Sequence, residues 1–396
     1  MFLQASGDCK HCSNKSHGEI KDYLCNFKLN DSQLDAVASC ISSSICPHKS
    51  SSVGLVWGPP GTGKTTTLAV MLHMLLMKKQ RILACAPTNM AVLQVASRLI
   101  GLIEKFSLSH RYSFGDIILF GNKDRLHIGK ELSKIYLDDR VKRLLRCFNR
   151  EVGWKHCVDS VLKFLTNCIS RYRMSLDIQA SSDDCNPTFK KYLTSKFNSL
   201  AEELVACIDT FFDHLPADSL GKNIDKMIFA KSLIYKVQKL LSADDVSDEL
   251  LFTMFEPSDE LSDPSTSHDG LKDDATEDLP DCDISLDNPL EIKSMCIKTL
   301  MDLSKMRLPC EENESSIRDL CLKQAKLIFC TASGSFELFR LQGVMPISIL
   351  VIDEAAQLKE AESLVPLLLP GIKHVLLIGD ENQLSSLVKS KVHFSL

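Results

Sequence analysis

Short runs of apolar residues recur along the chain, and most of them end at Gly, Pro or an acidic residue. The first two runs are each followed by apolar residues at helical spacing, as in "NMAVLQVASRLIGLI" after the second run. Strands and helices that alternate in this way predict an α/β fold with a doubly wound parallel sheet. We expect five strands to share this sheet, with "GDIILFG" (115–121) as a candidate for one more: 53–57, 81–85, 326–330, 348–352 and 374–378.

The pattern changes over residues 121–319, where long stretches carry apolar residues at helical spacing. One apolar stripe runs from Phe189 to Phe211, and such a stripe is usually buried core. We therefore expect a mostly helical insertion between two parts of the α/β domain, residues 25–120 and 320–396.

Two segments lack apolar periodicity. Residues 242–288 are rich in Ser, Asp and Pro, and positions 241–290 hold sixteen Asp or Glu against one Lys. Such a segment buries too little apolar surface to offset its ordering entropy, so we expect it to be disordered. We expect the same of the N-terminal tail, residues 1–24. A structural zinc site at its CxxC pair, Cys9 and Cys12, is the less favoured interpretation because no second pair follows at zinc-finger spacing.

The composition indicates a globular protein of ordinary hydrophobicity, with 44% hydrophobic and 24% charged residues and a net charge of −5. No apolar run reaches the length needed to span a bilayer, so we expect no membrane partner. The N-terminus lacks the apolar run of a signal peptide. The 16 cysteines do not follow the spacing of a disulfide framework. We therefore expect reduced thiols in the cytoplasm or nucleus.

A phosphate-loop motif, "GPPGTGKT", follows the first predicted strand and opens a helix. Its glycines let backbone N–H groups surround phosphates, and the helix N-terminus favours the same anions. Lys64 is expected to face the β and γ phosphates, and the Thr65 hydroxyl to reach Mg²⁺. The predicted nucleotide-binding residues of the loop are Gly58, Pro59, Pro60, Gly61, Thr62, Gly63, Lys64, Thr65 and Thr66.

Acidic and amide side chains follow two later strands. In "ILVIDEAAQ", Asp353 is placed to hold Mg²⁺ and Glu354 to orient or deprotonate an attacking water. In "LIGDENQL", the Gln383 amide is placed to sense the γ-phosphate. Upstream, Gln33 of "LNDSQLDAV" offers an amide that matches the two edges of adenine, although the same stretch also reads as an ordinary helix start.

Together these motifs carry a family resemblance. The set "LNDSQLDAV", "GPPGTGKTTT", "CAPTNMAV", "FCTASGS", "VIDEAAQ" and "IGDENQL", in this order, resembles the first motor domain of superfamily 1 helicases of the senataxin and nonsense-mediated-decay type. The resemblance implies a RecA-like phosphate-loop domain whose helical insertion is an accessory subdomain. It also implies an ATP-driven motor that moves 5′ to 3′ along single-stranded RNA or DNA, with the nucleus favoured over the cytoplasm.

The resemblance also implies roles for individual residues. Lys64, Asp353, Glu354 and Gln383 would bind and hydrolyse ATP with Mg²⁺, and Gln33 would recognise adenine. The nucleic-acid backbone would be contacted by Thr88, Asn89, Thr331 and Ser333, although turn and helix-cap duty is an alternative for these four. A basic segment either lines a strand path or is a solvated helix face, and protein partners are possible through the helical insertion and acidic stretch. The segment comprises Lys123, Arg125, Lys130, Arg140, Lys142, Arg143 and Arg146.

The sequence departs from the family after "GDENQL", where members continue into a second RecA-like domain. Arginines from across the cleft contribute about 10³–10⁵ in rate in phosphoryl transfer. From this ending we expect a fragment that hydrolyses ATP slowly and does not unwind duplexes. The alternative function is a catalytically impaired ATP- and nucleic-acid-binding module or decoy. A small-molecule kinase is disfavoured because no lid-like arginine cluster follows.

Overall fold

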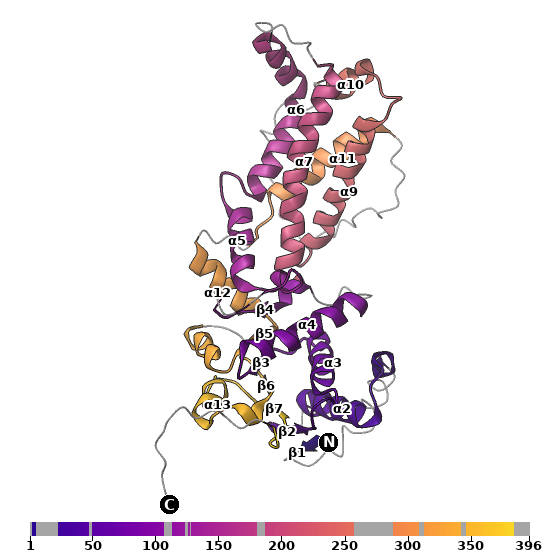
Figure 1. The fold of residues 1–396 in the computed structure, drawn as a ribbon. Helices are drawn as coiled ribbons and strands as arrows, with labels where there is room; N and C mark the ends of the chain where they lie inside the picture. The colour runs from indigo at the N-terminus through magenta and orange to yellow at the C-terminus, as the bar shows by residue number, and fades with distance from the viewer. Residues whose placement is uncertain are drawn as a thin grey trace, which may run out of the picture. The chain divides into compact units, whose positions relative to one another are not determined.

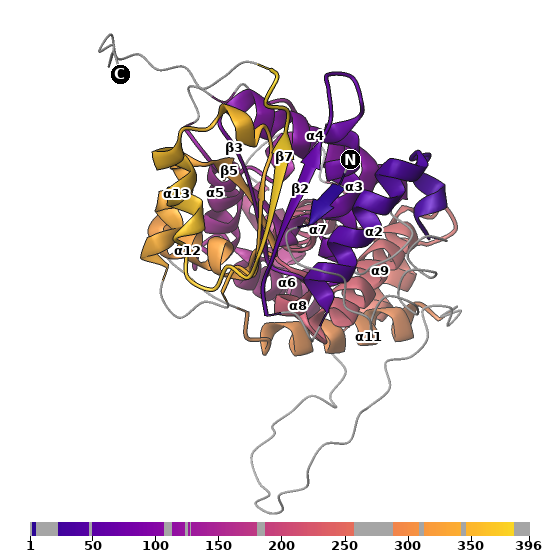
Figure 2. The same ribbon diagram turned by 90° about the horizontal axis from the view of Figure 1, so that it is seen from below.

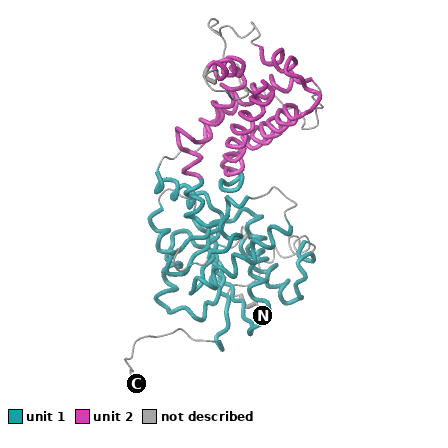
Figure 3. The backbone as a smooth tube through the Cα atoms, turned by 45° about the horizontal axis from the view of Figure 1, so that its top comes forward, with its two compact units in different colours: residues 1–143, 212–217, 313–396 teal, residues 144–211, 218–312 magenta. Residues whose placement is uncertain are grey.

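The computed structural model describes most of the chain as two compact units (Figure 3). Residues 1–143, 212–217 and 313–396 form what we call the sheet unit, and residues 144–211 and 218–312 form the helical unit. The described residues are 2–4, 23–46, 50–106, 113–122, 126, 128–179, 187–256, 288–308, 313–341 and 346–383.

The sheet unit is built on a seven-stranded sheet with the order β1-β2-β7-β6-β3-β5-β4. All neighbours are parallel except β1 and β2, which are antiparallel. The five strands predicted from the sequence share this sheet, so that prediction is confirmed, and the candidate at 115–121 contains β4. The strands are β1 (Phe2–Gln4), β2 (Ser52–Trp57), β3 (Ile82–Ala86), β4 (Ile117–Leu119), β5 (Leu327–Thr331), β6 (Ile349–Ile352) and β7 (His374–Gly379).

Helices cover both faces of this sheet (Figures 1 and 2). On one face lie α2 (Asp31–Ile45), α3 (Lys64–Met77) and α4 (Asn89–Phe106), and on the other lie α12 (Glu314–Gln324) and α13 (Glu360–Leu367). Ten consecutive residues of α3 are buried because it packs between α2 and α4, which accounts for its apolar residues on nearly every side. The predicted α/β class with a parallel sheet is thus confirmed.

Short 3₁₀ helices connect these elements in the sheet unit. Two of them follow strands at their carboxyl ends: η6 comes after β5 and η7 comes after β6. The 3₁₀ helices are η1 (Cys25–Phe27), η2 (Phe114–Asp116), η4 (Leu132–Lys134), η6 (Ser333–Arg340) and η7 (Ala355–Gln357).

The helical unit consists of long helices around an aromatic core. Phe189 stacks on Phe252 with ring centroids 4.2 Å apart, and Tyr172 lies 5.1 Å from Phe189. The predicted apolar stripe is core as expected, since Phe189, Phe211 and most positions between them on the stripe are buried. The helices of this unit are α6 (Trp154–Gln179), α9 (Asn223–Ser242), α10 (Asp248–Phe255), α11 (Pro289–Ser304) and most of α7 (Phe189–His214). Three of the described helices have residues in both units: α5 (Leu137–Phe148), α7 and α8 (Ala217–Leu220).

Two predictions of disorder are wrong in part. Helix α10 lies inside the acidic stretch 242–288, where it buries Leu251, Met254 and Phe255, and the Ser247 side chain accepts a hydrogen bond from its first turn. These three apolar positions at helical spacing bury one side of α10, which contacts α6. Residues 257–287 lie outside the described residues. In the N-terminal segment, residues 2–4 pair as β1 and residues 23–24 are helical, while the CxxC pair lies outside the described residues. Among the described residues, no helix combines the length and the apolar character that crossing a membrane requires.

Candidate nucleotide and nucleic-acid sites

The phosphate loop leaves the carboxyl end of β2 and leads into α3. Gly61 and Gly63 adopt φ angles of 78° and 82°, in a region that favours glycine. The Lys64 ammonium group donates to the carbonyl oxygens of Gly58 and Pro59, at 2.6 and 3.2 Å. The loop therefore curls around its own lysine, and Thr65 and Thr66 follow it in the first turn of α3.

Gln33 lies beside this loop, although it is 29 residues from Thr62 in the sequence. Its Nε2 donates to the Thr62 carbonyl oxygen at 2.9 Å, and its Oε1 accepts from the Asn30 backbone at 3.0 Å. The Asn30 side chain caps α2 by accepting from the Gln33 backbone, so the stretch is a helix start, whereas adenine recognition by Gln33 stays a prediction. A pocket lined by Gln33, Trp57, Lys64 and neighbouring residues joins the two elements. The structure thus brings the predicted adenine-recognition residue to the phosphate loop.

Asp353 follows β6, which is separated from β2 by β7 alone. The side chain is only 5% exposed, and its Oδ1 has no hydrogen-bond partner among the described residues. Burial, and secondarily the charge of Glu354, raise the pKa of Asp353 to about 6, while Lys64 opposes this shift. A buried carboxylate oxygen without a partner is costly, and a divalent cation would satisfy it. Asp353 therefore fits the predicted Mg²⁺ role.

Glu354 has an unusual backbone conformation, with φ 52° and ψ 40°. This left-handed region is unfavourable for a residue with a side chain and is typical of functional sites. The Glu354 carboxylate accepts a hydrogen bond from the Gln357 amide at 3.1 Å. The glutamate is thus oriented by its own "DEAAQ" motif.

Gln383 lies just past β7 and is held by Asp380. Its Nε2 donates to Asp380 Oδ2 at 2.9 Å, and the Asn382 backbone donates to Oδ1 at 3.0 Å. These two hydrogen bonds, the first above all, lower the pKa of Asp380. The Gly58 backbone also donates to the Gly379 carbonyl oxygen at 3.4 Å, which joins the phosphate loop to the same strand end.

A second pocket contains all four of the predicted nucleic-acid residues. Thr88 and Asn89 reach it from the end of β3, and Thr331 and Ser333 from the end of the neighbouring strand β5. Thr88 also caps α4 by accepting from the Ala91 backbone, and Thr331 accepts from the Gly334 backbone. The four residues therefore lie together, and two of them, Thr88 and Thr331, perform cap and turn duty. Their contact with nucleic acid stays a prediction.

This second pocket has further polar lining residues that sequence reasoning missed: Asn122, Arg318 and Glu337. Arg318 forms ion pairs with Asp138 and Glu337, and these pairs raise its pKa against the effect of burial. Asp138 is 180 residues from Arg318 in the sequence. No local pattern therefore indicated this group.

The basic segment does not act as one surface. Arg140 is fully buried and donates to the backbone carbonyl oxygens of Phe114, Gly115 and Ile117 at 2.7 to 2.9 Å. At Arg140 both interpretations, a strand path and a solvated helix face, are therefore wrong, because its buried guanidinium group holds the chain next to β4. Lys130, Lys142, Arg143 and Arg146 are exposed, and Lys123 and Arg125 lie outside the described residues.

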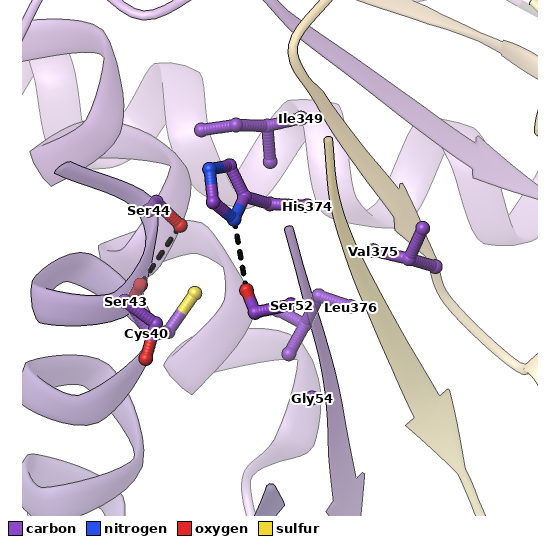
Figure 4. Close-up of a pocket in the computed structure, with 9 residues that line it drawn as sticks. All are labelled: Cys40, Ser43, Ser44, Ser52, Gly54, Ile349, His374, Val375 and Leu376. Atoms are coloured by element: carbon purple, nitrogen blue, oxygen red, sulfur yellow. Dashed lines mark hydrogen bonds between the residues drawn. The ribbon is translucent and has the colours of Figure 1, made fainter. Parts of the chain in front are cut away.

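A small cavity lies at the opposite, amino ends of β2 and β7 (Figure 4). There Ser52 Oγ and His374 Nδ1 lie 2.8 Å apart, and both residues are buried. Cys40 lines the cavity, and burial raises the pKa of its thiol to about 12. These buried polar groups pair within the protein, so the cavity belongs to the packing of α2 on the sheet.

Comparisons with known proteins agree with this geometry. The family described as "AAA domain" matches residues 28–391. Helicase sen1 of Schizosaccharomyces pombe is 24% identical over 98% of this chain, which covers 18% of that protein. DNA polymerase alpha-associated DNA helicase A of Saccharomyces cerevisiae is 38% identical over 36% of this chain, and the match covers 21% of that protein. The Regulator of nonsense transcripts 1 homolog of Arabidopsis thaliana is 41% identical over 18% of this chain, and the match covers 5% of that protein.

The chain thus spans about a fifth or less of the length of these relatives. The family match nevertheless covers most of the chain and includes every motif described above. The chain belongs to the AAA domain family, as a motor domain of the superfamily 1 helicases of the senataxin and nonsense-mediated-decay type.

Proposed function

We propose that this chain is the ATP-binding motor domain of a helicase that couples ATP hydrolysis to 5′-to-3′ movement on single-stranded RNA or DNA. The observation that carries the proposal is the buried carboxylate oxygen of Asp353, which has no hydrogen-bond partner among the described residues and lies at the sheet edge from which the phosphate loop leaves. The predicted nucleic-acid pocket supports it, because it lies at the carboxyl ends of β3 and β5 in the same sheet. In open α/β sheets ligands bind at this edge.

Each residue has a role in this proposal. Lys64 and the loop backbone bind the phosphates, and Gln33 contacts adenine. Thr65 and Asp353 would hold Mg²⁺, which when bound neutralises phosphate charge. Glu354 orients and deprotonates the attacking water, and Gln383 senses the γ-phosphate. The sugar-phosphate backbone of the nucleic acid is contacted by Thr88, Asn89, Thr331 and Ser333.

The test is ATP hydrolysis by the purified chain with and without single-stranded RNA or DNA. We expect the single-stranded nucleic acid to stimulate ATP hydrolysis. Glu354→Gln should lower the rate of hydrolysis by roughly 10²–10⁴-fold while ATP binding persists. Separation of a duplex with a 5′ overhang, and not of one with a 3′ overhang, would show 5′-to-3′ movement. Separation of neither duplex would match the slow fragment without unwinding activity that the sequence predicts. Binding of both ligands without stimulated hydrolysis would instead favour the impaired binding module. No binding of ATP would contradict both functions.

The cellular setting of this proposal is the nucleus, with the cytoplasm as the alternative. The helical unit and the acidic stretch are proposed to contact protein partners. Localisation of the tagged chain, and co-purification with and without residues 257–287, test these two points.

A further inference from the structure

The 3₁₀ helix η6 presents three different faces along its length. It runs over eight residues from Ser333, which belongs to the predicted nucleic-acid set. Side chains three positions apart eclipse one another in a 3₁₀ helix. Ser335 and Leu338 form the buried face, with 0% and 5% exposure.

A second face is polar, and its charges are paired. Gly334 and Glu337 line the nucleic-acid pocket. Glu337 accepts from Arg318 and from Arg340, each at 3.1 Å. Because these charges neutralise one another, this face adds little attraction for phosphates.

The third face is aromatic and open to solvent. Phe336 is 71% exposed and Phe339 is 41% exposed, with ring centroids 5.8 Å apart. Both follow Ser333 at intervals of three residues, so the aromatic rings continue the face on which the predicted backbone contact begins. Exposed rings next to a strand path are the arrangement that stacks bases.

We propose that Phe336 and Phe339 form a stacking platform for bases of the single-stranded nucleic acid whose backbone is held at Thr331 and Ser333. The inference rests on the proposed function. The platform adds residues that contact bases to the four predicted residues, which contact only the nucleic-acid backbone. Stacking on a ring does not depend on base identity, so the platform suits a motor that moves along any sequence.

The competing occupant is a protein partner, because α13 packs against η6 and both Leu364 of α13 and Leu368, which follows this helix, are exposed. A nucleic-acid strand is the favoured occupant, because the two rings continue the face of η6 that begins at Ser333 in the predicted nucleic-acid pocket. Leu368 is 68% exposed, which makes it a matched control for loss of exposed apolar surface.

The experiment measures binding of the chain to a fluorescent single-stranded oligonucleotide and to an abasic strand of equal length. We expect Phe336→Ala to weaken binding of the normal strand roughly ten-fold, and Phe336→Trp to retain it. On the abasic strand, Phe336→Ala and the parent should bind alike. Leu368→Ala should match the parent on both strands, and thermal unfolding should be unchanged for a ring so exposed.

Other outcomes distinguish failure of the stacking platform from failure of the proposed function. If the parent binds both strands and Phe336→Ala changes neither, the platform is wrong while the proposed function stands. The platform is also wrong if Phe336→Ala weakens both strands equally, or if Leu368→Ala has the same effect. If the parent binds neither strand, the proposed nucleic-acid function fails together with the platform.

Discussion

Strands β6 and β7 lie side by side, and each is followed by one aspartate that is almost fully buried, Asp353 at 5% and Asp380 at 4% exposure. At the end of β7, both oxygens of Asp380 accept hydrogen bonds and its pKa is lowered. At the end of β6, Asp353 keeps one oxygen without a partner among the described residues, and its pKa is raised to about 6. The difference teaches that the protein itself satisfies one carboxylate, whereas the other keeps an oxygen that the proposed Mg²⁺ ion would satisfy.

The largest effect on ATP binding is expected at Lys64, whose charge opposes the rise in the pKa of Asp353 and contributes to the lowered pKa of Asp380. Lys64→Ala removes the charge that faces the β and γ phosphates, and we expect ATP affinity to fall by about 100-fold, since hydrogen bonds to charged groups are the strong ones. Titration with a fluorescent ATP analogue measures it. Ser52→Ala, at the opposite end of β2, is the control and should bind ATP as the parent does. Equal affinity of Lys64→Ala and the parent would remove Lys64 from the site.

The next effect tests the open end of β6. Asp353→Asn should abolish most of the dependence of ATP binding on Mg²⁺, a change of about ten-fold, because the amide does not replace a charged ligand. Without ligands the same variant should be more stable than the parent at pH 7.5, by about 2 kcal/mol, because a buried charge is removed that has one oxygen without a hydrogen-bond partner among the described residues. Calorimetric titration and thermal unfolding measure the two. A variant that is less stable than the parent would show that Asp353 is satisfied.

The pH dependence follows from the same raised pKa. Between the unfolded value of 3.8 and the folded value of about 6, the folded chain binds more protons than the unfolded chain at Asp353. The contribution of Asp353 to stability therefore falls as pH rises through this window, by roughly 3 kcal/mol in all. Conversely, the Mg²⁺-dependent part of ATP binding should decline as pH falls below about 6. The difference in unfolding free energy between the parent and Asp353→Asn, measured from pH 4 to 8, checks this. A difference that stays constant with pH would contradict it.

The convergence of motifs was predictable, because parallel strands bring their carboxyl ends to one edge, and the motifs follow strands. Which carboxylate is satisfied was not predictable, since "DEAAQ" and "DENQL" look alike in sequence. Arg318 with Asp138, and Arg140 with the carbonyl oxygens near β4, depend on contacts between distant segments. Helix α10 was missed because charge composition hid its three apolar positions. Strand β1 is only three residues long, too short for a periodic signal.

The smallest effect is expected at the closed end of β7. Asp380→Asn keeps one oxygen but presents an amide donor to either the Asn382 backbone or the Gln383 amide, which are donors themselves. One hydrogen bond is therefore lost and the preference for a charged acceptor disappears, so the thermal midpoint should fall. Because the pKa of Asp380 is lowered in the folded state, its stabilising contribution is present at neutral pH and is lost as pH falls through that pKa. Asp380→Asn should hence destabilise the chain at pH 7.5 and converge with the parent in acid, opposite in sign to Asp353→Asn. If both variants shift the midpoint in the same direction, the two strand ends do not differ in the way their hydrogen bonds indicate.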